Sequence, residues 1–242
     1  MRHSLCPSLF LIELFIKMES NSEQIQVLAE TLEKEYGVPE RSSTKSPLDT
    51  LIGTILSQNT SDTNSRNAYE SLREEFPTWS KVHNTPVEDI ADAIRSGGLA
   101  NQKSHRIKRV LDWLHDHRGS LEMDWICDED PYEILQQFTD IKGIGVKTIS
   151  IVLCFNCRHD VFPVDTHVNR VAGRLGLVSE KSSPNRTFRK LDPIIPEGKS
   201  LTLHLNMIRH GREVCKSRNP RCGECVLLDM CEYGQRDLKG AA

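Results

Sequence analysis

The chain has 242 residues, of which 38% are hydrophobic and 27% charged, a balance that fits a globular protein and excludes disordered and fibrous classes. Its apolar N-terminal stretch, residues 9–16, contains Glu13 and is far shorter than the ~20 residues of a membrane span, so we expect no membrane partner. The net charge of −3 hides a basic region: residues 141–221 carry 15 Lys and Arg against six Asp and Glu. Such a region can hold a polyanion.

The first elements along the chain are an extension and a helix. Residues 1–20 show no usable pattern and Met18 is an alternative start, so we expect a disordered N-terminal extension there. Apolar residues then recur at helical spacing at Ile25, Leu28, Leu32 and Tyr36. Gly37 follows this stripe and is a typical helix stop.

Further helices are predicted to residue 138 from start signals and apolar stripes. Ser46 with Pro47 begins one at 46–58, and Asp130 with Pro131 begins another at 130–138. Thr85 with Glu88 forms a predicted capping box for a helix to residue 94. A stripe at 107–114 predicts a helix that ends before Gly119. Neither alternating strands nor hairpin turns of a sheet are visible, so the fold class is all-α.

The segment 142–148, KGIGVKT, combines a tight turn with the start of a buried helix. Gly143 and Gly145 mark the turn, and the apolar run 149–155 predicts the helix. Lys147 therefore lies in the first helical turn, where the positive helix end disfavours its charge. Asp165 precedes another helical stripe at 164–176 and is a typical N-cap.

Four of the eight cysteines are concentrated near the C-terminus, with gaps of six, two and five residues: Cys215, Cys222, Cys225 and Cys231. Four close thiolates can enclose one metal centre, either zinc or an iron–sulfur cluster, and the lack of paired short CxxC knuckles favours iron. Two disulfides are the alternative. Cys154 and Cys157 also form a CxxC, for which we favour core packing, and Cys127 stands alone.

Together the lysine-bearing glycine hairpin, the segment PVDTH at 163–167, the HGR at 210–212 and the cysteine tail resemble endonuclease III, of the helix-hairpin-helix DNA glycosylase superfamily. The resemblance runs from about residue 21 to 233. It implies an all-α, two-lobed fold in which residues 40–159 form a six-helix barrel, with the helix-hairpin-helix at about 131–155. The second lobe would comprise residues 21–39 and 160–237, and the four C-terminal cysteines would hold a 4Fe-4S cluster.

The resemblance also implies roles for single residues. Lys147 would be the nucleophile, assisted by Asp165, while the hairpin amides of Gly143 and Gly145 would grip a DNA phosphate. Gln58 or Asn59 would fill the gap left by a flipped base, although bacterial members carry glutamine where Asn59 stands. Further DNA contacts would come from Lys103, from Arg212 and from Lys142, which replaces the usual bacterial proline.

The resemblance implies a bifunctional DNA glycosylase and lyase of base excision repair that removes oxidised pyrimidines and nicks the strand by β-elimination. Its partner would be double-stranded DNA with a damaged base or an abasic site. We expect an intracellular monomer, in the cytoplasm or nucleoid of a prokaryote or in the nucleus or an organelle of a eukaryote. One alternative is a glycosylase of this fold for uracil, mismatched thymine or 5-methylcytosine, because FPVDT also resembles the plant demethylating members. Another is a non-catalytic DNA-binding module with a structural metal.

Overall fold

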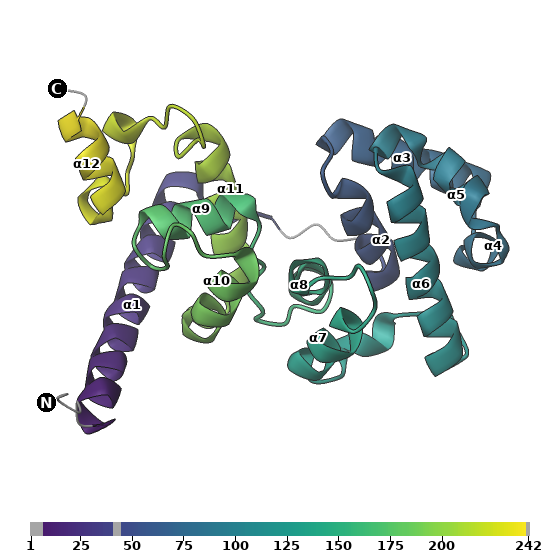
Figure 1. Ribbon diagram of the computed structural model, residues 1–242, viewed down its shortest axis with the longest axis horizontal. Coiled ribbons are helices and arrows are strands. Elements are labelled where there is room, and N and C mark those ends of the chain that lie inside the picture. Colours follow the sequence, from purple (N-terminus) through teal and green to yellow (C-terminus); the bar gives the residue numbers. More distant parts are fainter. Residues whose placement is uncertain (1–6, 41–44, 241–242) are drawn as a thin grey trace, which may run out of the picture. The chain divides into compact units, whose positions relative to one another are not determined.

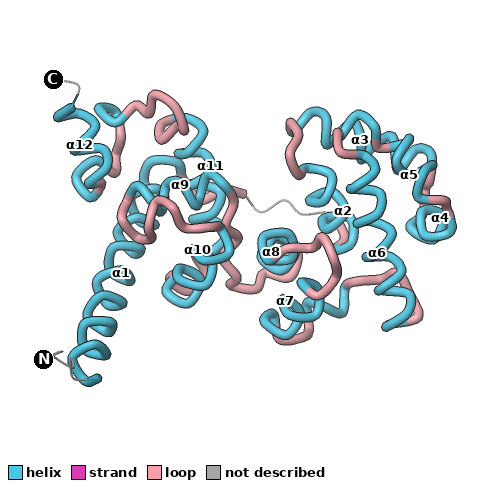
Figure 2. The backbone as a smooth tube through the Cα atoms, in the orientation of Figure 1, coloured by secondary structure: helices cyan, strands magenta, loops and turns pink. Residues whose placement is uncertain are grey.

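The structure is a computed structural model that describes residues 7–40 and 45–240, with side chains from residue 21 on. All regular elements in these residues are helices (Figures 1 and 2), as the sequence predicts. The chain divides into two compact units, one of Met1–Glu40 with Phe162–Ala242 and the other of Arg41–Val161. The barrel bounds predicted from sequence, 40 and 159, differ from this division by one and two residues.

The unit Arg41–Val161 contains the helix-hairpin-helix. Its helices are α2 (Pro47–Ser57), α3 (Asp62–Glu75), α4 (Trp79–Asn84), α5 (Val87–Ala93), α6 (Ala100–Arg118), α7 (Pro131–Thr139) and α8 (Val146–Phe155), with short 3-10 helices η1 (Arg95–Gly97) and η2 (Asp124–Cys127). Their apolar faces meet in a core in which Leu51, Ile55, Leu111 and Ile149 are fully buried. Helix α2 packs against α3, α6 and α8, so it lies at the centre of the unit.

Two of the three caps predicted in this unit form. The Ser46 hydroxyl accepts a hydrogen bond from the Asp49 amide at 3.1 Å, and the Asp130 carboxylate accepts from the next two free amides of α7 at 2.9 and 3.0 Å. The capping box at Thr85 is wrong. Its hydroxyl donates to the carbonyl of Lys81 at 2.7 Å and so closes α4, which leaves α5 to begin after Pro86 without a side-chain cap.

The other unit is formed by α1 (Pro7–Tyr36), α9 (Thr166–Arg174), α10 (Pro184–Leu191), α11 (Ser200–Glu213) and α12 (Glu232–Gly240), with 3-10 helices η3 (Asp192–Ile194), η4 (Cys222–Glu224) and η5 (Leu228–Met230). Apolar residues of α1, α9 and α11 share its core. Residues 7–20 were expected to be disordered but continue α1, while residues 1–6 lie outside the described part. In that part, no helix is both long and apolar enough to span a membrane.

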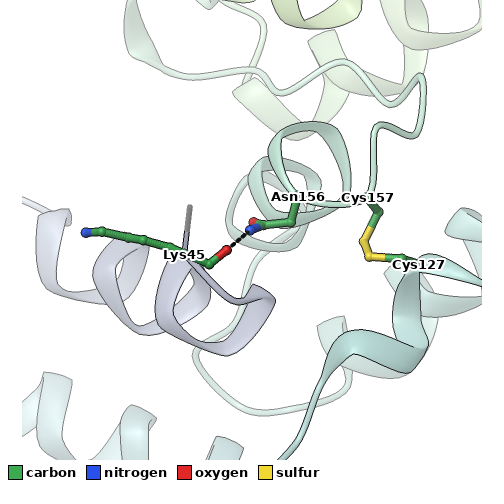
Figure 3. Close-up of a disulfide and its surroundings, with 4 residues drawn as sticks. All are labelled: Lys45, Cys127, Asn156 and Cys157. Carbon is green, nitrogen blue, oxygen red and sulfur yellow. Dashed lines mark hydrogen bonds between the residues drawn. A yellow bond between two sulfur atoms is a disulfide. The ribbon is translucent and has the colours of Figure 1, made fainter. Parts of the chain in front are cut away.

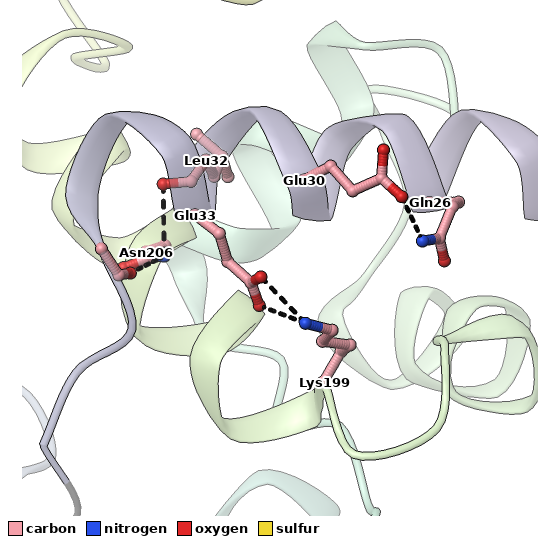
Figure 4. A network of polar contacts seen from close by, with 7 residues as sticks. Gln26, Glu30, Leu32, Glu33, Lys199 and Asn206 are labelled. Carbon is pink, nitrogen blue, oxygen red and sulfur yellow. Dashed lines mark hydrogen bonds and ion pairs between the residues drawn. The ribbon is translucent and has the colours of Figure 1, made fainter.

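Polar contacts fasten the C-terminal end of α1 to α11 (Figure 4). The buried Asn206 amide donates to the carbonyls of Leu32, at 3.3 Å, and Gly37, at 3.0 Å. Leu32 lies near the end of α1 and Gly37 directly follows it, so one side chain of α11 holds both the helix and its exit. Beside it, the Lys199 ammonium lies 2.8 Å from the Glu33 carboxylate. Because the N-terminal helix is held in this way, it belongs to the same compact unit as the C-terminal segment.

Asn206→Ala should therefore lower the free energy of unfolding. The change removes both hydrogen bonds from α11 to the end of α1 and leaves the Gly37 carbonyl without this donor, which costs about 1–3 kcal/mol. Urea denaturation at 25 °C measures it. The control is Gln26→Ala, which removes an exposed hydrogen bond to Glu30 on the same helix and should change stability by less than about 0.5 kcal/mol. Equal stability of the two variants would contradict this role of Asn206.

Candidate functional site

The hairpin between α7 and α8 depends on its first glycine. Gly143 has a φ of +101°, and a Cβ added there would lie 2.8 Å from the Cγ atom of Arg106. Both the backbone and the packing therefore require glycine at this position. Gly145 differs, because its φ is −103° and an added Cβ would meet nothing within 4 Å. The fold does not need a glycine at 145, which leaves the exposed backbone open to close approach by a ligand.

Helix α6 holds the hairpin from one side. The Arg106 side chain lies along Gly143, and the Arg109 guanidinium donates to the carbonyl of Lys142 at 2.8 Å. Arg106, Arg109 and Lys142 line one surface hollow of about 380 Å³, together with Asn101, Gln102, His105 and Gly143. Three cations on one hollow form an anion-binding surface. Sequence reasoning missed the two arginines, although their spacing of three places them on one helix face.

Gln58 and Asn59, the two candidates to fill the gap left by a flipped base, lie in the loop after α2 and differ in their contacts. Gln58 is tied down, since its amide donates to the Thr148 hydroxyl at 3.2 Å and its carbonyl oxygen accepts from Arg106. Asn59 is exposed and has a left-handed φ of 52°, a conformation that asparagine tolerates better than most residues. Gln58 thus connects α2 to α6 and α8, while Asn59 projects at the turn.

Lys103 does not lie on the surface, and its predicted phosphate contact is wrong in this structure. The side chain is fully buried, and its ammonium donates to the carbonyls of Leu56 at 2.7 Å and Gly97 at 2.8 Å. Leu56 belongs to the last turn of α2, where carbonyls carry the negative end of the helix dipole. Burial, and then the charge of Arg106, lower the pKa of Lys103. Lys103 therefore fixes the end of α2 just before Gln58 and Asn59.

The two predicted catalytic residues lie one in each unit. Lys147 is half-buried in the first turn of α8, two residues after Gly145. Asp165 caps α9, and its Oδ1 accepts from the amide of Val168 at 2.8 Å. The cap fixes the carboxylate relative to its own helix. Arg212 is exposed near the end of α11, as a DNA contact would require.

The four predicted metal-binding cysteines, 215, 222, 225 and 231, line one cavity. Three nitrogen atoms lie near their sulfurs. The Arg174 guanidinium donates to the Cys215 sulfur at 3.3 Å, the Gly234 amide donates to that of Cys231 at 3.3 Å, and Nε2 of His210 lies 3.5 Å from that of Cys225. Hydrogen bonds of this kind are typical around metal-bound thiolates, whose negative charge they stabilise.

His210 is neutral because burial lowers its pKa to about 4. Its Nδ1 lies 3.0 Å from the Tyr36 hydroxyl. A metal-bound sulfur can only accept a hydrogen bond, which would place the ring proton on Nε2 and make Nδ1 the acceptor of the tyrosine proton. The His210 ring therefore links Tyr36, at the end of α1, to Cys225.

The four cysteine side chains fit an iron–sulfur cluster, which is held by cysteine thiolates. Burial, with nearby carboxylate and thiolate charges, raises the pKa of Cys222 to about 11, so the thiols need a bound cation to become thiolates. Among the described residues, no three His, Cys, Asp or Glu side chains are placed to hold a single metal ion.

Comparisons with known proteins decide the family. The chain matches the HhH-GPD superfamily of base excision DNA repair proteins over residues 52–197, and the iron-sulfur binding domain of endonuclease III over residues 215–231. It belongs to the HhH-GPD superfamily. The second match begins at Cys215 and ends at Cys231, so it contains all four cysteines. The protein is an endonuclease III-like DNA glycosylase with an iron–sulfur cluster in its C-terminal region.

Individual relatives agree with this assignment. Endonuclease III of Sulfolobus acidocaldarius is 36% identical over 201 residues, which cover 81% of this chain and 86% of that protein. A candidate DNA glycosylase of Arabidopsis thaliana is 36% identical over 203 residues, covering 84% of this chain and 67% of its own. The solved structure of a trapped covalent endonuclease III–DNA intermediate has a TM-score of 0.76 and 27% identity, and covers 90% of this chain and 98% of its own.

Lys103 is buried and Lys142 is exposed, so removing the first charge should affect stability and removing the second should affect DNA binding. Lys103→Met should lower the free energy of unfolding by about 1–3 kcal/mol, because two buried carbonyls lose their donor. It should leave the salt dependence of DNA binding unchanged. Lys142 is exposed at the hairpin, so Lys142→Met should keep stability and reduce the slope of log K against log salt by about 1. Urea unfolding and binding at several salt concentrations measure both. A reduced slope for Lys103→Met would show that Lys103 contacts DNA and would contradict its structural role.

Proposed function

We propose that this protein is a bifunctional DNA glycosylase and lyase that removes oxidised pyrimidines and then nicks the strand through an imine on Lys147. The observation that carries the proposal is the position of Lys147, in the first turn of α8 directly after the glycine hairpin. Lys147 follows by two residues the exposed backbone of Gly145, where a DNA phosphate can approach. The similar solved structure, in which endonuclease III is trapped as a covalent intermediate with DNA, supports the covalent route.

The reaction begins when the damaged nucleotide rotates out of the duplex. The Lys147 amine attacks C1′ of the sugar, the bond from C1′ to the base breaks, and the base leaves with the bonding electrons and takes up a proton. Loss of a proton from the nitrogen and opening of the sugar ring give the imine. The imine acidifies a proton on C2′, and its removal expels the 3′ phosphate by β-elimination. Water then releases the lysine.

Asp165 is the acid–base partner in this proposal. Its Oδ1 accepts the helix amide of Val168, so the carboxylate is ordered before DNA arrives. An ordered carboxylate can accept the proton that the attacking amine loses, and its charge stabilises the cationic sugar that develops as the base departs. The cap therefore serves the folding of α9 and the chemistry with the same side chain.

DNA would be held by the hairpin and by the hollow beside it. Arg106, Arg109 and Lys142 supply positive charge, and the amides near Gly145 supply hydrogen-bond donors. Asn59 is the better candidate to fill the gap left by the flipped base, because it is exposed at the turn. Gln58 is held by Arg106 and Thr148 and would support that loop. The iron–sulfur cluster would order the C-terminal segment that carries it.

The substrate class rests on the likeness to endonuclease III. It is tested with duplexes that each contain one defined lesion, scored separately for base release and for nicking. We expect both with oxidised pyrimidines. Release only from mismatched thymine, uracil or 5-methylcytosine would support the alternative glycosylase, and no release from any duplex would support a binding module.

Borohydride added during reaction with a lesion-bearing duplex should trap a covalent protein–DNA adduct, because it reduces the imine to a stable amine. Lys147→Gln should abolish the adduct while keeping affinity for damaged DNA, since glutamine is polar but not nucleophilic. Asp165→Asn can still cap α9 and should slow turnover by roughly 100-fold or more with an unchanged melting temperature. Gel analysis and single-turnover kinetics provide the readouts. Wild-type base release without any adduct would refute the lyase route.

Gly145→Ala should weaken DNA binding without loss of stability. The added methyl meets no atom of the protein, so only a ligand that approaches the backbone will be displaced. We expect Kd for undamaged duplex to rise by roughly 10-fold, as for the loss of one charge-assisted contact. Gly53→Ala on α2 is the matched control, because its methyl also meets nothing within 4 Å. Equal affinities of both variants would contradict a phosphate contact at Gly145.

A further inference from the structure

A disulfide joins Cys127 to Cys157, two residues that the sequence analysis did not pair (Figure 3). Cys127 is the last residue of η2, three residues before the cap of α7 at Asp130. Cys157 lies two residues after the end of α8 at Phe155. The bond spans 30 residues and brings the two Cα atoms to 4.6 Å. It therefore closes a loop that contains all of α7, the hairpin and α8.

We propose that Cys127 and Cys157 form a reversible thiol–disulfide site, which opens with low-molecular-mass thiols and sets how tightly the helix-hairpin-helix binds DNA. The part concerning DNA rests on the proposed function. Both cysteines are partly exposed, whereas Cys154, three residues before Cys157, is buried in α8 as the sequence predicts. Exposed disulfides can be reached by an attacking thiolate, and buried thiols cannot be.

The bond joins two segments that noncovalent contacts attach to different neighbours. On the η2 side, Trp125 packs with Phe138 of α7 at 6.3 Å between ring centroids and lies under the Arg118 guanidinium at 3.6 Å. On the α8 side, the Asn156 amide donates to the carbonyl of Lys45 at 2.8 Å, next to the start of α2 (Figure 3). When the disulfide opens, η2 stays attached to α6 and α7, and the end of α8 to the α2 side. The two ends of the motif then lose their crosslink and stay joined only by the backbone and by the packing of α7 on α8.

The exchange needs one co-reactant, a thiol such as glutathione. A glutathione thiolate attacks one sulfur of the pair, which breaks the Cys127–Cys157 bond and gives a mixed disulfide with one protein thiolate released. A second glutathione thiolate attacks the mixed disulfide and releases the other protein thiolate. Two protein thiols and one glutathione disulfide result, so two electrons pass to the protein. The reverse reaction uses glutathione disulfide.

Closure should favour DNA binding. A crosslink restricts the ensemble of the loop it closes, so the hairpin amides keep the arrangement that a phosphate needs. In the reduced protein, part of that ordering must occur on binding, which weakens affinity. Catalytic groups are not part of the bond, so imine formation by DNA that is already bound should continue in both states.

The first test asks whether the site exists and exchanges. Native full-length protein is equilibrated at graded ratios of glutathione to its disulfide, alkylated and digested without reduction, and its peptides are weighed. We expect a crosslinked Cys127–Cys157 peptide at oxidising ratios and two alkylated cysteines at reducing ratios. Absence of the crosslinked peptide at every ratio would overturn the proposal, as would a crosslink that never opens in the folded protein.

The second test measures DNA affinity of oxidised and reduced protein, with the visible absorption of the cluster followed to confirm that it stays intact. We expect Kd for an undamaged duplex to rise by roughly threefold to tenfold on reduction, the size of a modest loss of preorganisation. The double variant Cys127→Ser with Cys157→Ser should bind DNA with the affinity of the reduced protein under both oxidising and reducing conditions. Cys154→Ala, which keeps the disulfide, should respond as the wild type does.

The outcomes separate this proposal from the proposed function. Equal affinities in both redox states, with a borohydride adduct still formed, would overturn the regulatory site and leave the glycosylase intact. Loss of DNA binding and adduct in both states would instead refute the proposed function, and with it the regulation of DNA binding. A double variant that still responds to glutathione would assign the response to other cysteines and overturn the site.

Discussion

The hairpin between α7 and α8 depends on the close contact between Gly143 and Arg106. A left-handed backbone and a side chain packed where a Cβ would stand allow only glycine there. The same arginine donates to Gln58, and Gln58 in turn donates to Thr148 on α8. One contact thus connects the hairpin, the loop after α2 and the helix that carries Lys147. The effects of substitutions in these three segments should not be additive, because the segments share hydrogen bonds as well as a common core.

Features encoded by neighbouring residues could be predicted from the sequence. The caps at Ser46, Asp130 and Asp165 form because each side chain needs only an amide two or three residues ahead. The glycine hairpin and the cysteine spacing are similarly local, and their joint occurrence indicated the family. Thr85 shows the limit of such reasoning. Its hydroxyl could cap the start of α5 or the end of α4, and it donates to the Lys81 carbonyl of α4.

Features that depend on distant residues could not be predicted in this way. Lys103 looked like a surface cation beside a DNA-contacting loop, but its acceptors are the carbonyls of Leu56 and Gly97, one of them 47 residues away. The partner of Cys157 lies 30 residues earlier, so its CxxC neighbour was the wrong residue to consider. Arg106 and Arg109 line a hollow with Lys142 only because α6 packs beside the hairpin. In each case the missing information was tertiary contact, which periodicity and capping rules do not contain.

Lys103 also shows why the sequence position of a cation is poor evidence for a DNA contact. A buried ammonium is costly unless its donors are satisfied, and the last carbonyls of α2 are an available set of acceptors with negative partial charge. The lysine therefore neutralises a helix end inside the protein and contributes nothing to the outer surface. Its pKa is lowered by burial, so the unfolded chain binds this proton more tightly than the folded one does. The contribution of Lys103 to stability consequently increases as pH rises from the lowered value towards its ordinary one. Lys142, with the same formal charge, is exposed at the hairpin and contributes its charge to the outer surface.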